Sequence, residues 1–142
     1  MDRFTRNYSI ALGLALVALV ALWVGSNWNP RVWELNDLLE TDTSLSSYPY
    51  QFRVIALDNG IATLSTPRSF DVPAIRFLAI IHPELAGADP DDRRMVAAQQ
   101  DLADHQKQAQ ALIARQPDVK AVRWRLDTEW LADHGVHMQG RP

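Results

Sequence analysis

The 142-residue chain contains no cysteine. This absence excludes disulfide bonds, thiolate metal sites, cysteine nucleophiles and an acylated lipoprotein cysteine. The chain also lacks an excess of basic residues, because its formal net charge is −3, and it has no glycine-rich phosphate loop. The composition therefore argues against a nucleic-acid-binding protein and against the common nucleotide-binding motifs.

What the chain does have is one long apolar segment near its N-terminus. Residues 8–24, YSIALGLALVALVALWV, carry no charge. At about 1.5 Å per residue, a helix of this length is at the short end of what crosses the apolar core of a bilayer. We interpret residues 1–26 as a cytoplasmic stub followed by a transmembrane anchor.

The residues flanking the apolar segment predict its orientation. Arg3 and Arg6 precede it, so the positive-inside rule places the N-terminus in the cytoplasm. Trp23 and Trp28 are suited to the opposite interface as membrane-anchoring residues. The alternative is a cleaved signal peptide, since VGS at 24–26 is a tolerable cleavage site. Either interpretation exports the following domain, which in a bacterial cell predicts a single-pass inner-membrane protein with a periplasmic head.

Two amphipathic helices are predicted after a short linker, NWNPR, at residues 27–31. The first begins at Val32 and ends between residues 41 and 47. The second has Asp89 as its N-cap and Pro90 at its first position, and it stops near Pro117. Its narrow apolar stripe consists of Met95, Ala98, Leu102, Ala109, Leu112 and Ile113.

A β-hairpin is predicted between these helices, in the stretch VIALDNGIATLST at 54–66. Asn59-Gly60 is a strong type I′ turn signal, because both central residues of that turn need a positive φ. Pairing residue 58 with 61 then places 55 opposite 64. The face predicted to pack in the core carries Ile55, Leu57, Ala62 and Leu64.

A third strand is predicted near the C-terminus, where VKAVRWRLD alternates between apolar and polar residues. Val122, Trp124 and Leu126 share the apolar face. The predicted fold class is therefore α+β, a single N-terminal transmembrane helix followed by a two-layer α-β-β-α-β sandwich. The exported domain is expected to cover residues 32–136, with a tail at 137–142.

An apolar insertion at residues 67–97 separates the hairpin from the long helix. Asp71 is a possible helix cap and Pro73 lies near the expected helix start. The apolar side chains that follow, which include Phe77, Leu78 and Ile81, point all round a helical wheel. They either complete the core or form a surface that docks onto a membrane-protein partner.

Three stretches of the exported domain resemble the BON domain, a small α-β-β-α-β module of bacterial envelope proteins. They are LNDLLETDTSL, FRVIALDNGIATLST and AQALIARQPDVKAVRWRL, and the resemblance as a whole extends over roughly residues 33–66 and 98–127. Asp118 stands where that family usually has glycine, and residues 67–97 are additional. The resemblance implies a non-catalytic module that binds phospholipid or other envelope components.

Candidate catalytic and metal-binding residues do not form a recognisable motif. The four histidines, His82, His105, His134 and His137, lack a third ligand at a diagnostic spacing. The acidic residues, among them Asp101, Asp104, Asp127 and Glu129, are interpreted as solvated surface groups. We therefore expect a protein that is not an enzyme and that has no cofactor and no metal.

The outer face of the third strand carries two arginines, Arg123 and Arg125. A guanidinium group binds phosphate and carboxylate in a bidentate manner, so this face either is an ordinary solvated surface or holds anionic phospholipid or an acidic partner. The leading prediction is an accessory or scaffolding subunit of a larger membrane complex. A stand-alone phospholipid-binding protein of the envelope is the alternative.

Overall fold

The computed structural model describes residues 2–27 and 29–138. The chain divides into two compact units, Met1–Pro30 and Arg31–Pro142. The first unit contains helix α1 (Arg3–Asn27). Its segment Arg3–Gly25 is long and apolar enough to span a membrane or to act as a signal sequence, and none of it is buried within the protein. The predicted N-terminal apolar helix is thus confirmed at this level.

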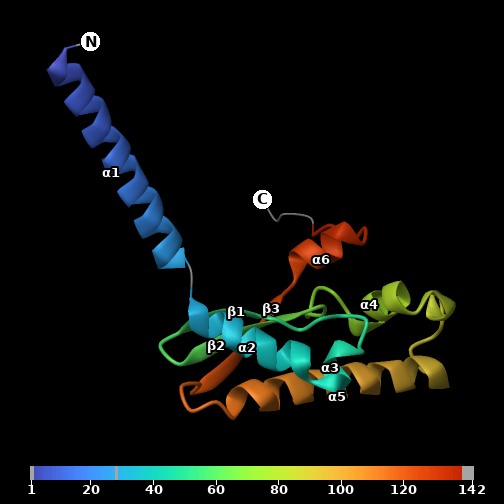
Figure 1. Cartoon of the computed structure of the whole chain (residues 1–142). Coiled ribbons are helices and arrows are strands. Elements are labelled where there is room, and N and C mark those ends of the chain that lie inside the picture. The colour runs from blue at the N-terminus through green and yellow to red at the C-terminus, as the bar shows by residue number, and fades with distance from the viewer. Residues whose placement is uncertain (1, 28, 139–142) are drawn as a thin grey trace. The chain divides into compact units, whose positions relative to one another are not determined.

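The remainder of the chain is α+β, as predicted, with a three-stranded mixed sheet packed against helices (Figure 1). Helix α2 begins at Pro30, two residues before the expected start. The elements are α2 (Pro30–Thr41), α3 (Thr43–Ser46), β1 (Val54–Asp58), β2 (Ile61–Thr66), α4 (Ala74–Ile81), η1 (Pro83–Leu85), α5 (Arg93–Ala114), β3 (Ala121–Leu126) and α6 (Thr128–Asp133).

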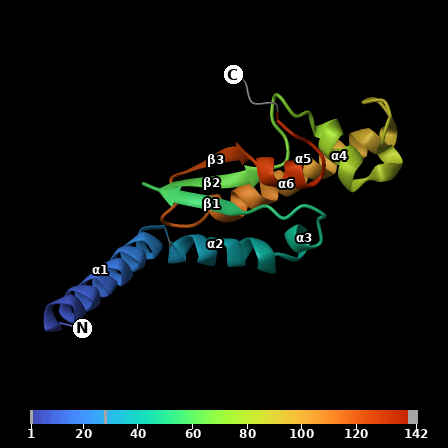
Figure 2. The same ribbon diagram turned by 90° about the horizontal axis from the view of Figure 1, so that it is seen from above.

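The sheet has the order β1-β2-β3, with β1 antiparallel and β3 parallel to the central strand. The parallel connection from β2 to β3 runs through α4, η1 and α5, because parallel strands need a long crossover. Helix α5 lies along one face of the sheet and α2 lies beside β1 (Figures 1 and 2). Among the described elements of the unit Arg31–Pro142, no helix lies over most of the opposite face, as Figure 2 shows, and we call this the uncovered face.

The hairpin turn has the predicted conformation, with φ of 50° at Asn59 and 81° at Gly60. The first pairs also match the expected register, but a β-bulge then shifts it, so that Val54 rather than Ile55 lies opposite Leu64. Val54 is consequently buried and Ile55 is 43% exposed. The prediction that Ile55 belongs to the core was wrong, because a bulge moves every side chain before it to the other face.

Helix α5 covers the sheet with the apolar stripe predicted from the sequence. Met95, Leu102, Ala109 and Ile113 are buried, while Ala98 and Leu112 pack partly buried against them. The predicted N-cap was wrong: the helix begins three residues later, and the carboxylate of Asp92 accepts a hydrogen bond from the Arg94 amide. Asp89 instead opens a preceding turn, in which its carbonyl accepts from the Asp92 amide at 3.0 Å.

The apolar part of the insertion forms helix α4, which belongs to the main core. Phe77 and Leu78 are fully buried, and Ile81 is partly buried at the edge of the same cluster. The residue that caps α4 is Pro73, and Asp71 does not cap it. Phe77 and Leu78 are buried whereas Arg76 is exposed, so α4 packs through one face and is not apolar on all sides as expected.

An aromatic cluster links the segment before β1 to helices α4 and α6. The Tyr50 ring makes edge-on contacts with Phe52, Phe77 and Trp130, at centroid distances of 5.0, 5.8 and 5.4 Å. Such pairs add about 0.5–1.5 kcal/mol each to the contribution of burial. This cluster fixes α4 and α6 to the extended segment that leads into the sheet.

Candidate functional site

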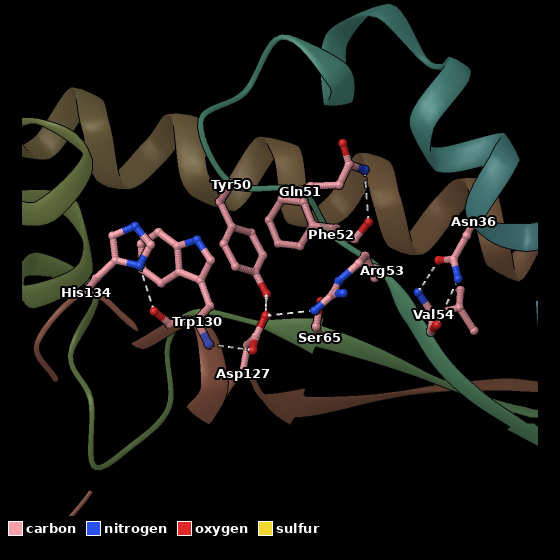
Figure 3. Close-up of polar contacts among 10 residues, drawn as sticks. All are labelled: Asn36, Tyr50, Gln51, Phe52, Arg53, Val54, Ser65, Asp127, Trp130 and His134. Carbon is pink, nitrogen blue, oxygen red and sulfur yellow. Dashed lines mark hydrogen bonds and ion pairs between the residues drawn. The ribbon is translucent and has the colours of Figure 1, made fainter. Parts of the chain in front are cut away.

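A surface pocket of about 380 Å³ opens where the start of β1 and the end of β3 lie close together. Its wall is mostly polar and includes charged residues of both signs. The lining residues are Asn36, Arg53, Val54, Ile55, Ser65, Arg125, Leu126, Asp127, Thr128 and Glu129. Figure 3 shows the buried side of this pocket, which we call the Asp127 pocket.

Asp127 is the most enclosed charged residue of the pocket, and its two carboxylate oxygens have different partners. Oδ2 accepts a hydrogen bond from the Tyr50 hydroxyl at 2.8 Å and lies 3.6 Å from Nη2 of Arg53. Oδ1 accepts from the Trp130 amide at 3.1 Å and thereby caps α6 (Figure 3). The prediction that Asp127 is a solvated surface group was wrong.

The Tyr50 hydroxyl acts here as a donor and not as an acid. Burial is the main cause that raises the pKa of Tyr50 well above its ordinary value, and the Asp127 carboxylate raises it further. The phenol therefore stays protonated at neutral pH. The pair joins the segment before β1 to α6, and this arrangement is structural.

On the side of the pocket next to β1, side chains make hydrogen bonds to the backbone of the chain at the start of this strand. Asn36 of α2 accepts a hydrogen bond from the Val54 amide at 2.7 Å and donates to the Val54 carbonyl at 3.1 Å. On the other side of the strand, the Ser65 hydroxyl accepts from the Arg53 amide at 3.0 Å. These contacts hold the bulged strand and direct the Arg53 side chain towards Asp127 (Figure 3).

The two predicted arginines lie on β3 and are exposed on the uncovered face of the sheet. Arg123 is level with Thr63 and Arg125 is level with Ser65 on the neighbouring strand. Within residues 2–27 and 29–138, neither guanidinium makes a hydrogen bond or an ion pair. Ile61 lies on the same face of the central strand and is 40% exposed.

The other predicted contact residues are placed differently. Phe77 and Leu78 are fully buried, so in the folded protein they form core and not the docking surface suggested by their sequence. Ile81 is partly exposed beside them. Trp23 is exposed on α1, as an interface residue would be. Trp28 lies outside the described residues.

Two of the four histidines, His105 and His134, pack against aromatic rings. His105 stacks on Tyr48 at a centroid distance of 4.1 Å, and His134 stacks on Trp130 at 3.9 Å. In the part of the chain that the structure describes, no group of three histidine or acidic side chains has the geometry to hold a metal ion. Their contacts are those of residues at the boundary of the core.

Sequence reasoning missed Tyr50, Arg53 and Asn36, which build the Asp127 pocket. One signal for them was present, because Tyr48, Tyr50 and Phe52 occupy every second position, separated by Pro49 and Gln51, in the manner of an extended, half-buried segment. All three aromatic side chains are buried. Nothing in the sequence indicated that Asn36, 18 residues from Val54, reaches its backbone.

Comparison of the chain with protein-family models, with curated proteins and with solved structures found no match. The resemblance to the BON domain therefore stays a prediction from the quoted residues.

Proposed function

We propose that this protein is a non-catalytic accessory or scaffolding subunit of a larger membrane complex in a bacterial envelope. In this proposal α1 is a retained single-pass anchor in the inner membrane, with the N-terminus in the cytoplasm. The α+β unit is then the periplasmic head that contacts the partner subunits.

The observation that carries the proposal is the uncovered face of the sheet. It presents two arginines without acidic partners, with the exposed Ile61 on the neighbouring strand. Exposed arginine combined with aliphatic surface is typical of protein interfaces, where arginine is enriched. The partner surface expected from this chemistry is acidic at its rim and apolar at its centre.

Photocrosslinking in the membranes of the native cell tests this proposal. A photoreactive amino acid is introduced at position 123 or, as a matched control, at position 96, where Val96 is exposed on α5. We expect position 123 to yield one specific adduct with a membrane protein, and position 96 to yield none. The same adducts from both positions, or no adduct from position 123, would contradict docking through the sheet.

A second candidate function is binding of anionic phospholipid, which the unpaired guanidinium groups of Arg123 and Arg125 favour. Vesicle binding by the Arg123→Ala/Arg125→Ala variant tests this candidate function. The control is Arg93→Ala/Arg115→Ala, which removes the same charge. In this alternative, only the first pair reduces binding of soluble residues 29–142 to vesicles that contain phosphatidylglycerol. Equal binding by all three proteins argues against a lipid site on this face.

A further inference from the structure

A second pocket lies on the helix side of β3 and is separate from both features described above. It has a volume of about 300 Å³, near the lower end of the range for small-molecule sites. The residues that line it come from the end of β2, the following loop, α5 and β3. They are Thr66, Arg68, Ala103, Gln106, Lys107, Gln110 and Trp124. We call it the Lys107 pocket.

The charge of the Lys107 pocket has one sign. Arg68 and Lys107 both line it, whereas none of its lining residues is acidic. Within residues 2–27 and 29–138, neither cation makes an ion pair or a side-chain hydrogen bond. This differs from the Asp127 pocket, whose lining includes the acidic residues Asp127 and Glu129 and in which Arg53 forms an ion pair with Asp127.

The remaining wall supplies neutral polar groups and an aromatic surface. The Gln106 amide donates a hydrogen bond to the Thr66 hydroxyl at 2.8 Å, and this holds the two elements of the wall together. Gln106 Oε1 is buried and has no hydrogen-bond partner among the described residues, which is uncommon in a folded protein. The Trp124 indole supplies the apolar side of the pocket. Such a wall fits a ligand that has an anionic head and a hydroxyl-bearing or planar body.

We propose that the Lys107 pocket binds a phosphate monoester, with Arg68 and Lys107 as the residues that contact the phosphoryl oxygens. Arginine offers paired donors to phosphate and lysine adds a mobile charge, so the two together suit a dianionic group better than a single carboxylate. The site is on the face of β3 opposite to Arg123 and Arg125. It is therefore independent of the docking surface proposed above.

Titration of the full chain in phosphatidylcholine nanodiscs with glycerol 3-phosphate tests the proposal. Fluorotryptophan labelling gives one ¹⁹F resonance per indole, and Trp124→Phe identifies the resonance from the pocket. We expect a saturable shift of the Trp124 resonance. Arg68→Gln/Lys107→Gln should weaken binding by at least about tenfold, because two charge-assisted contacts are lost. Arg93→Gln/Arg115→Gln removes the same charge from exposed positions of α5 and should change affinity by less than about twofold.

The same label distinguishes a soluble ester from a lipid head group. A shift on adding glycerol 3-phosphate supports a soluble ligand, whereas a shift caused by phosphatidic acid in the nanodisc, whose head group is a phosphate monoester, supports a lipid ligand if the shift is lost in Arg68→Gln/Lys107→Gln. No shift with either ligand overturns the proposal. Equal weakening by both charge pairs also overturns it, because that result indicates a general effect of charge and no defined site.

Discussion

Two buried tyrosines lie two residues apart, and their hydroxyl groups have opposite environments. The Tyr50 hydroxyl donates to the Asp127 carboxylate, whereas the Tyr48 hydroxyl is buried without a hydrogen-bond partner. A hydrogen bond to a charged group contributes about 1.5–3 kcal/mol, and an unsatisfied buried hydroxyl costs free energy. A comparison of the two tyrosines therefore separates the effect of the hydrogen bond on stability from the effect of burying a hydroxyl group.

We predict that Tyr50→Phe lowers the free energy of unfolding by about 2 kcal/mol, because Asp127 loses its strongest neutral donor. The matched variant Tyr48→Phe should be neutral or stabilising, since it removes a hydroxyl that has no partner. Urea unfolding of residues 29–142 measures both. Equal destabilisation by the two variants would show that the Tyr50–Asp127 contact does not contribute to stability.

A second residue pair fastens the start of the folded unit to the loop before β3. Nε and Nη2 of Arg31 donate to the two oxygens of Asp118 at 2.8 and 2.9 Å, and Nη2 also donates to Gln116. These hydrogen bonds from Arg31 are the main cause that lowers the pKa of Asp118 below its ordinary value. Asp118, which takes the place of a glycine in the BON pattern, therefore joins two segments 87 residues apart.

This pair predicts a defined dependence of stability on pH. The folded pKa of Asp118 is lower than its unfolded value of about 4, so the pair stabilises the fold above that pH and the contribution is lost as the pH falls through the folded pKa. Asp118→Asn should therefore unfold at a lower temperature than the wild type at pH 7, and the difference should shrink below about pH 4. In an Arg31→Gln background the same substitution should have little effect at pH 7. A difference that does not change with pH would contradict this account.

At the scale of secondary-structure elements, α2 contacts β1 through one side chain. This side chain makes the backbone hydrogen bonds that a neighbouring strand would otherwise make. Asn36 satisfies both backbone groups of Val54 at the edge of the sheet. An edge strand otherwise exposes unpaired amide and carbonyl groups to other chains. The contact lies beside the β-bulge, where Val54 is buried and Ile55 is exposed.

We predict that Asn36→Ala lowers the free energy of unfolding by about 1–3 kcal/mol, because two partly buried backbone groups lose their partner. The control is Asp37→Ala, whose exposed side chain makes no hydrogen bond or ion pair with any residue that the structure describes. Hydrogen exchange should show faster exchange at the Val54 amide in the first variant only. Unchanged protection of that amide would mean that Asn36 does not cap the strand.

At the scale of the whole molecule, the apolar helix and the α+β unit are separate compact units. The α+β unit has its own core, made of residues from every helix after α1 and from all three strands, whereas α1 contributes no residue to it. The helix is apolar on all sides over most of its length, as a membrane span or a signal sequence is. Folding of the head should therefore not require the anchor.

We predict that residues 29–142 are soluble and unfold at a temperature close to that of the full chain in a neutral detergent. The full chain should stay in the membrane pellet after alkaline carbonate extraction, because an inserted helix is held by apolar transfer. Mass spectrometry of the extracted protein tests the alternative interpretation of α1 as a cleaved signal peptide. A mass that lacks residues 1–26 would show that the segment is a cleaved signal peptide.

The sequence alone determined the elements whose signals are local. The unbroken apolar run, the Asn59-Gly60 turn, the stripe of α5 and the alternation of β3 each depend on neighbouring residues, and each has the predicted form. Local periodicity is informative because helix and strand place side chains at fixed intervals. The class of the fold followed from the order of these elements.

Tertiary structure decided what depends on residues that are distant in the sequence. The bulge at Ile55 arises where Asn36 reaches Val54, and Asp127 becomes a buried cap because Tyr50 and Arg53 approach it from a segment more than 70 residues away. The burial of Phe77 and Leu78 depends on α5 and on the aromatic cluster. Local patterns do not contain these contacts, because a partner brought close by folding leaves no fixed spacing in the sequence.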